Sequence, residues 1–153
     1  MKIITKQSEN MGGVVRLWAI PRSDISLNGI TPTITSGENV VCMDITQDST
    51  EAGYIPKFSF AGSTYVHELN GFIPGYSQDT ERIILDMIRQ SRYVVVYLDS
   101  EGVPVLLGRP EIPIRFTATF GTGQTTASSR GYKISFSGNV HYPPIRLQSN
   151  PFM

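Results

Sequence analysis

Hydrophobic and polar residues alternate along most of the chain, most clearly between Arg92 and Tyr142. Side chains on a β-strand point alternately to opposite faces, so a period of two predicts half-buried strands. Residues 93–98 form an apolar run that predicts a buried strand, which a turn at 99–102 joins to a returning strand over 103–108. The alternation predicts two further strands, over 114–120 and 132–137.

The first half of the chain gives the same signal with more interruptions. It predicts a strand over 13–20 that Pro21 ends, a strand over 40–46, and a hairpin of 56–60 with 63–69. The pair Asn70-Gly71 predicts a hairpin-type turn, and Pro74-Gly75 closes this section. Residues 22–39 are predicted to form a long loop, because the turn signals Asn28-Gly29 and Thr31-Pro32 separate isolated apolar residues.

One segment, from about 79 to 90, has helical spacing. Ser77 can cap it, because its hydroxyl can accept a hydrogen bond from an unpaired backbone N–H of the first turn. Acidic residues in the first turn and basic residues near the end match the helix dipole. We expect one apolar stripe to lie on the sheet, formed by Ile83, Ile84, Met87 and Ile88 and widened by Leu85.

These elements predict a mainly β fold, a β-sandwich or small β-barrel with one packed α-helix. The length of 153 residues suits a single domain spanning 1–153. Its irregular parts are the long loop 22–39, the polar loop 121–131 and an extended, proline-stiffened C-terminal tail over 141–153.

Charge is scarce and balanced, with 17% charged residues and 13 of each sign. A low-charge exterior favours a subunit that lies against neighbours, and the zero net charge argues against a dedicated duplex-binding protein. The charges are unevenly placed: residues 38–101 hold ten acidic and four basic residues, and residues 108–153 hold one and five. This asymmetry fits ordinary solvated faces, or complementary faces that meet between copies.

Reactive groups do not form a recognisable constellation. The single cysteine, Cys42, cannot form an internal disulfide and lies in an apolar strand, where a small hydrophobe is expected rather than a nucleophile. His67 and His141 lack the spacing of metal ligands. Gly121-x-Gly123 lacks the lysine and the following helix of a phosphate-binding loop.

Two other groups have ordinary explanations. Asp99 and Glu101 flank a turn, where acidic residues are favoured for backbone reasons. Five aromatic residues could form a sugar-binding platform, although packing in a core or an interface is favoured: Trp18, Tyr54, Tyr65, Tyr76 and Tyr142. We therefore predict no enzyme activity and no catalytic, cofactor-binding or metal-binding residue.

Targeting signals are not evident. No apolar run approaches the roughly 20 residues that cross a bilayer, and the N-terminus lacks the apolar core of a signal peptide. The sequence predicts a protein made in the cytoplasm without a membrane partner.

The segment from Phe58 to Tyr142 resembles phage virion proteins of the tail or neck. The similarity lies in residues 58–60 and 69–75, the single helix, the strand pair around 99–102 and 106–108, and residues 116–119 and 131–138. The resemblance implies a small β-barrel or sandwich beside one helix. It also implies homo-oligomeric rings, commonly hexameric, that stack into a conduit for DNA and contact adjacent tail or connector proteins.

We therefore expect a non-enzymatic structural subunit of a phage tail or head–tail connector. It would assemble in the bacterial host cytoplasm, reside in the virion and let DNA pass through the lumen without specific binding. The alternative is a monomeric ligand-binding β-sandwich, such as a carbohydrate-binding or adhesin module.

Overall fold

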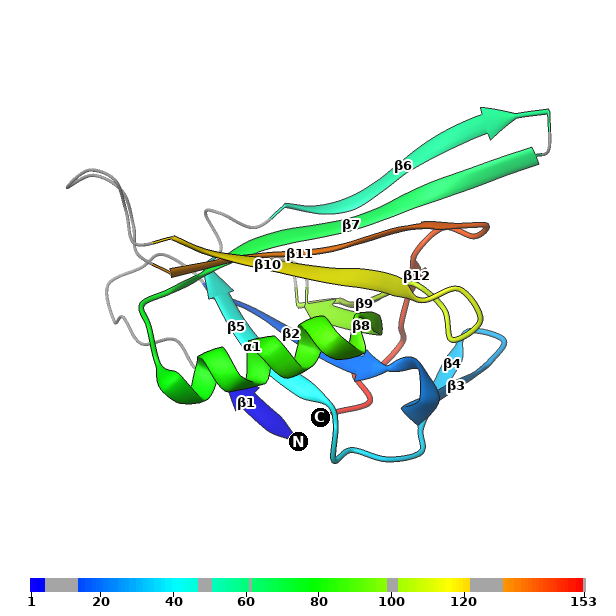
Figure 1. The fold of residues 1–153 in the computed structure, drawn as a ribbon. Coiled ribbons are helices and arrows are strands. Elements are labelled where there is room, and N and C mark those ends of the chain that lie inside the picture. The colour runs from blue at the N-terminus through cyan, green and yellow to red at the C-terminus, as the bar shows by residue number, and fades with distance from the viewer. Residues whose placement is uncertain (5–13, 47–50, 61, 99–101, 122–130, 153) are drawn as a thin grey trace.

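A computed structural model describes residues 1–4, 14–46, 51–60, 62–98, 102–121 and 131–152 (Figure 1). The fold is mainly β with a single α-helix among these residues, as the sequence predicted. Its elements are β1 Lys2–Ile4, β2 Val14–Pro21, the 3₁₀ turn η1 Arg22–Asp24, β3 Ile25–Asn28, β4 Thr31–Ile34, β5 Val41–Thr46, β6 Glu51–Ser59, β7 Gly62–Pro74, α1 Gln78–Gln90, β8 Arg92–Leu98, β9 Pro104–Leu107, β10 Ile114–Gly121, β11 Gly131–Val140 and β12 Ile145–Arg146.

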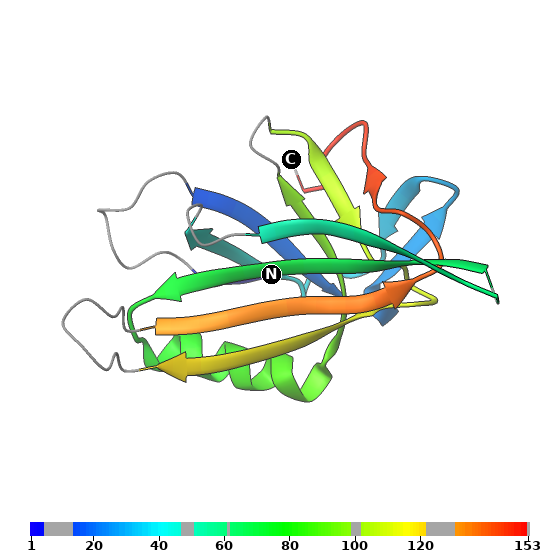
Figure 2. The same cartoon turned by 90° about the horizontal axis from the view of Figure 1, so that it is seen from above.

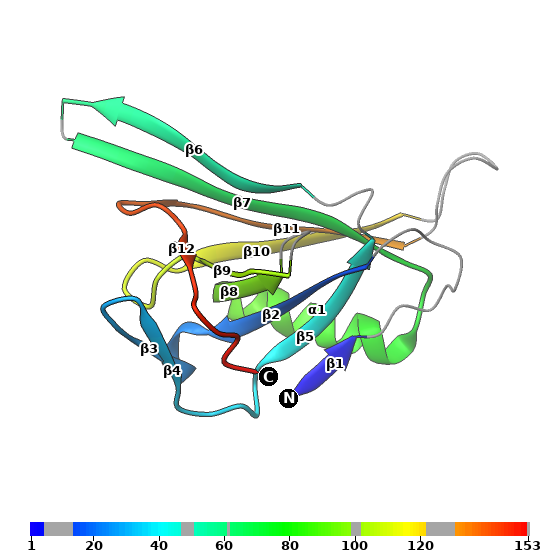
Figure 3. The same cartoon turned by 180° about the vertical axis from the view of Figure 1, so that it is seen from behind.

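One strongly bent sheet contains all the strands except β3 and β4, in the order β1-β5-β2-β8-β10-β11-β7-β6. Strand β8 also pairs with β9, which in turn pairs with β12. The bend makes two facing layers, with β1, β5, β2 and β8 opposite β10, β11 and β7 (Figures 1 and 3). The two ends of this order, β1 and β6, are not paired with each other, so the described sheet is not a closed barrel.

The main core lies between the two layers. Phe116 of β10 and Phe136 of β11 are almost wholly buried there, with ring centroids 4.9 Å apart. Ile45 of β5 lies directly over Gly71 of β7, where a Cβ atom would meet the Ile45 Cδ1 at 2.7 Å. The layers are therefore in close contact at this point, and a larger residue at 71 would push them apart.

A second core cluster lies on the other face of β2, β5 and β8. It contains Trp18, Cys42 and Val96, and is covered by the β3–β4 hairpin and the C-terminal segment. Because both faces of this layer are largely buried, its strands are mostly apolar, with Arg16 in β2 and Asp44 in β5 among the exceptions. The prediction of a buried strand over 93–98 is confirmed for β8.

The predicted long loop over 22–39 is wrong. Residues 22–34 form η1 and the β3–β4 hairpin, which turns at Gly29 with φ +65°. Ile25, Leu27 and Ile34 pack on the second core cluster. These apolar residues looked isolated in the sequence, but they are spaced for one face of a hairpin.

The C-terminal tail is not simply extended. Strand β12 pairs with β9, Leu147 is buried, and Phe152 stacks on Trp18 with ring centroids 5.2 Å apart. The segment is therefore held by this chain itself. The predicted loop 121–131 begins and ends on paired residues, Gly121 and Gly131, while 122–130 lie outside the described residues.

Helix α1 begins as predicted, because the Ser77 hydroxyl accepts a hydrogen bond from the Thr80 N–H. Its buried face is narrower than expected. Ile84 and Met87 are buried and Ile83 packs at the edge of the core, whereas Leu85 and Ile88 are 50% and 41% exposed. The helix lies across the open side between the two layers and contacts β10 and β1.

The predicted hairpin of 56–60 with 63–69 is confirmed and is longer than expected. The predicted turn at Asn70-Gly71 is wrong, because β7 continues through both residues to Pro74. Asn70 and Gly71 are paired with Ser135 and Ile134 of β11, and this pairing keeps the strand extended.

Candidate interaction surface

The β6–β7 hairpin projects beyond the rest of the molecule (Figures 1 and 2). Strand β11 pairs with β7 from Pro74 back to Tyr65. Residues 62–64 of β7 and their partners 57–59 of β6 therefore extend past the end of β11. We call residues 54–60 and 62–66 the arm.

One face of the arm continues the core face of the sheet. His67 and Leu69 are buried on β7, and Tyr65 shares their face because side chains alternate. On β6, Tyr54 lies opposite His67, and Phe58 lies opposite Ser63. The core-facing stripe thus runs outward onto a part of the sheet that no described element covers.

Several exposed side chains of the arm are large and apolar, and they lie among the exposed polar residues Lys57, Ser59 and Ser63. Phe58 is 80% exposed and Phe60, at the turn, is fully exposed. Tyr54 and Tyr65 contact each other edge to face at 5.7 Å between ring centroids. Ile55, on the opposite face, is 54% exposed. Contiguous exposed apolar surface of this kind is typical of interaction sites.

The outer edge of β6 is open, since β6 pairs only with β7 among the described strands. Pro56 lies in the middle of this edge strand, paired in register with Tyr65. Proline lacks the N–H of a ladder and is found on edge strands, where it hinders further pairing. The arm therefore offers its aromatic face more readily than its backbone.

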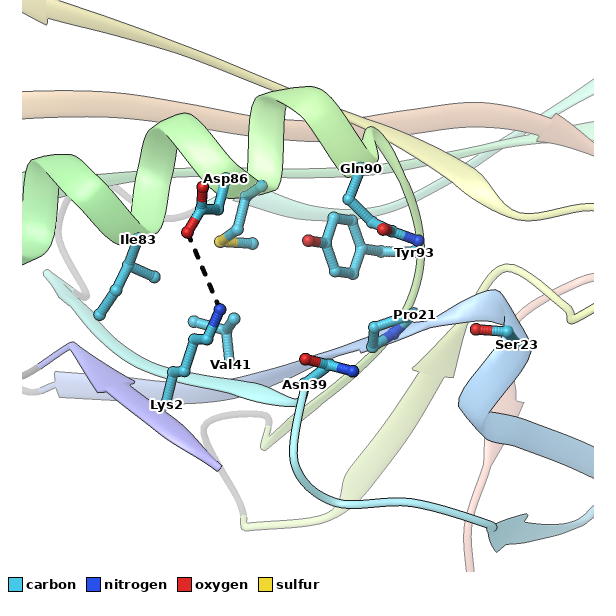
Figure 4. Close-up of a pocket in the computed structure, with 10 residues that line it drawn as sticks. Lys2, Pro21, Ser23, Asn39, Val41, Ile83, Asp86, Gln90 and Tyr93 are labelled. Carbon is cyan, nitrogen blue, oxygen red and sulfur yellow. Dashed lines mark ion pairs between the residues drawn. The ribbon is translucent and has the colours of Figure 1, made fainter.

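A pocket lies between α1 and strands β1 and β5 (Figure 4). Lys2 and Asp86 form an ion pair of 3.9 Å that bridges β1 and α1, and Val41, Met87 and Tyr93 contribute the apolar lining. Burial, with a smaller effect from Asp86, raises the pKa of Tyr93 to about 12. The cavity of about 130 Å³ is smaller than the roughly 300–1,000 Å³ of small-molecule sites.

Residues weighed for chemistry are not brought together. Cys42 is buried in the second core cluster, and burial raises the pKa of its thiol, which disfavours the reactive thiolate. Within the described parts of the chain, no three His, Cys, Asp or Glu side chains form a group that could hold a metal ion. Asp99, Glu101 and Gly123 lie outside the described residues.

The five aromatic residues fall into separate places. Trp18 is buried against Phe152, so it cannot belong to an open platform. Tyr54 and Tyr65 lie on the arm, Tyr76 packs near Phe120, and Tyr142 lies under the Arg109 guanidinium, whose Cζ is 4.1 Å from the ring centroid. The sequence-based expectation of core or interface packing fits this separation better than a single platform.

Sequence reasoning did not single out the arm's exposed phenylalanines or the bonding of His67. Because Phe58 lies two residues from Pro56 on a predicted hairpin, the sequence could place both residues on the same face of a strand. It could not predict that the Phe58 side chain is exposed. His67 is 1% exposed and bonds to groups 41 and 75 residues away, which no local pattern reveals.

No family model matches the chain, and searches of curated proteins and of solved structures also give no match. Among the described residues, no helix is long and apolar enough to span a membrane.

Proposed function

We propose that this protein is a non-enzymatic structural subunit that assembles with copies of itself into a ring of a phage tail or head–tail connector. The observation that carries the proposal is the arm, whose core-facing side is apolar and uncovered over Tyr54, Phe58 and Tyr65. Burying such a face against a neighbouring copy removes from water the surface that the chain alone leaves exposed.

The sheet also supports association between different surfaces of two copies. Its ends are β1 and β6, and β1 exposes Ile3 to 60%. Contacts between unlike surfaces close into rings where the rotation permits. Exposed Leu85 and Ile88 on α1 add a second apolar area distant in sequence from the arm.

Phage tail and neck proteins, which the sequence resembles, commonly form hexameric rings, and we propose a ring of this kind. Adjacent tail or connector proteins would be its partners. DNA would pass through the lumen without specific binding, which suits a chain of zero net charge. In this proposal the arm bridges subunits, and no reactive group takes part.

The test compares the two faces of the arm. Analytical ultracentrifugation and negative-stain electron microscopy should show rings for the natural protein. The variant Phe58→Ser/Phe60→Ser should lose them, because truncating aromatic anchors typically weakens association by about tenfold or more. Ile55→Ser, on the opposite face, is the matched control and should still assemble.

A strictly monomeric natural protein at high concentration, without rings or tubes, would contradict the proposal. At a protein concentration too low for assembly, thermal unfolding of both variants should match that of the natural protein, because the exposed side chains contribute little to the fold. This check separates lost assembly from lost folding.

The second candidate is a ligand-binding β-sandwich, and the contact of exposed Tyr54 with half-buried Tyr65 on one open face favours it. It predicts a monomer that binds glycans and loses binding on Tyr54→Ala. A glycan array together with the sedimentation measurement distinguishes the two candidates.

A further inference from the structure

The tripeptide Leu-Asn-Gly occurs twice in the chain, at residues 27–29 and 69–71, and an apolar residue follows it each time. Asparagine is a thermolabile residue, and its side chain reacts most readily before glycine, because glycine has no side chain to obstruct its backbone nitrogen. The two copies share this local chemistry. A large difference in their reactivity would therefore come from the fold around them.

The first copy lies at the tip of the β3–β4 hairpin (Figure 3). Asn28 pairs with Thr31, so Gly29 and Ile30 form a two-residue turn outside the ladder. Residues 28–30 are all exposed. Gly29 has φ +65°, and a Cβ atom on it would meet nothing within 4 Å. The space beside this backbone is open, and few contacts resist a local rearrangement of the turn.

The second copy lies inside the large sheet. Asn70 pairs with β6 on one side and with β11 on the other. Its side-chain amide donates a hydrogen bond to the Glu68 carboxylate at 3.0 Å. A Cβ atom on Gly71 would lie 2.7 Å from the Ile45 Cδ1, so the backbone here is tightly packed. Both the amide and the following backbone nitrogen are therefore fixed by their neighbours.

The reaction available to the first copy joins two of its own atoms. The backbone nitrogen of Gly29 loses its proton to a base in solution and attacks Cγ of Asn28. The bond from Cγ to Nδ2 breaks, Nδ2 takes up a proton and leaves as ammonia, and a five-membered cyclic imide remains. Water then opens the imide at one of its two carbonyl carbons. The product is an aspartyl residue or, where the main chain now runs through Cγ, an isoaspartyl residue.

We propose that Asn28 is a spontaneous deamidation site of the folded protein, whereas the sheet protects Asn70 from the same reaction. The balance is one amide and one water converted into one carboxylate and one ammonium ion, with no change of oxidation state. The formal net charge at pH 7 falls from zero to −1, because a neutral side chain becomes an anion. The new charge lies on the hairpin that packs on the second core cluster.

The test follows the natural protein, kept folded at mildly alkaline pH and physiological temperature. Peptide mapping by mass spectrometry and isoelectric focusing measure the products over time. Asn28 should be converted to a mixture of aspartyl and isoaspartyl forms while a more acidic form of the protein accumulates. Asn70 should react at least about a hundredfold more slowly, because it reacts only when the sheet opens. The rate at Asn28 should rise with pH, since the attacking nitrogen must lose a proton.

The same chain in denaturant is the matched control. Unfolding removes the structure that distinguishes the two copies, so their rates should then agree within about threefold. The variant Asn28→Gln would need a larger ring for the same attack, and it should not form the acidic product.

Equal rates at Asn28 and Asn70 in the folded protein would overturn the proposal. So would an intact Asn28 after a period in which the denatured chain is converted at both positions, or an acidic form that persists in Asn28→Gln. Aspartyl product without any isoaspartyl form would exclude the cyclic imide. The comparison of folded with denatured protein uses the natural chain alone, so it holds even if Asn28→Gln does not fold.

Discussion

The layer of β2, β5 and β8 and the arm of β6 and β7 belong to the same sheet, but they differ in how far their faces are buried. Val94, Val95 and Val96 of β8 are fully buried, with one face in each core cluster. On the arm, Phe58 and Phe60 are among the most exposed large side chains of the described residues.

The two regions differ in what covers their apolar faces. The chain supplies its own cover for the first, using the β3–β4 hairpin and the C-terminal segment (Figure 3). No described element lies over the core-facing side of the arm tip. Apolar surface that a fold leaves uncovered in one place, while covering it fully elsewhere, fits a role in association.

The same substitution in the two regions gives the largest contrast. Phe136→Ala should lower the free energy of unfolding by about 3–5 kcal/mol, because it removes a buried ring that packs on Phe116 and leaves a cavity. Phe58→Ala should change it by less than about 0.5 kcal/mol. Chemical denaturation of both variants measures the difference, and equal losses would mean that the arm is part of the cooperative core.

A smaller effect is expected where the two layers touch. Gly71→Ala should cost about 1–3 kcal/mol, since its new methyl group would overlap Ile45 Cδ1. Adding Ile45→Val removes that carbon, so the double variant should be more stable than the sum of the single effects predicts.

Gly121→Ala is the matched control for this cycle, because its Cβ would meet nothing within 4 Å. Strict additivity of Gly71→Ala and Ile45→Val would show that β5 and β7 do not touch in solution as they do in the structure.

Elements with a strong local period were predictable from the sequence. Strand β8 is a short apolar run, strands β10 and β11 alternate within a few residues, and Ser77 caps α1 through a contact three residues away. The mainly β class followed from these elements alone.

Features that depend on distant partners were not predictable. Asn70-Gly71 has the composition of a turn, but pairing with β11 keeps it extended. Leu85 and Ile88 look like part of one apolar stripe, but the sheet covers only the side of α1 that carries Ile84 and Met87. His67 gains its two bonds from segments that only the fold brings near.

The smallest change in stability is expected for a substitution at Pro56. This substitution also tests how the arm associates. Replacing Pro56 by valine should alter the free energy of unfolding by less than about 0.5 kcal/mol, because the residue is exposed. It would restore an N–H to the open edge of β6, and an unprotected edge strand is a template for pairing with other chains. We therefore expect Pro56→Val to aggregate faster, measured by thioflavin T fluorescence at equal concentration.

Ser63→Thr, on the partner strand, raises β-propensity without adding a donor and should behave like the natural protein. If both variants aggregate equally, the backbone edge is not what Pro56 protects, and the aromatic face alone governs how the arm associates.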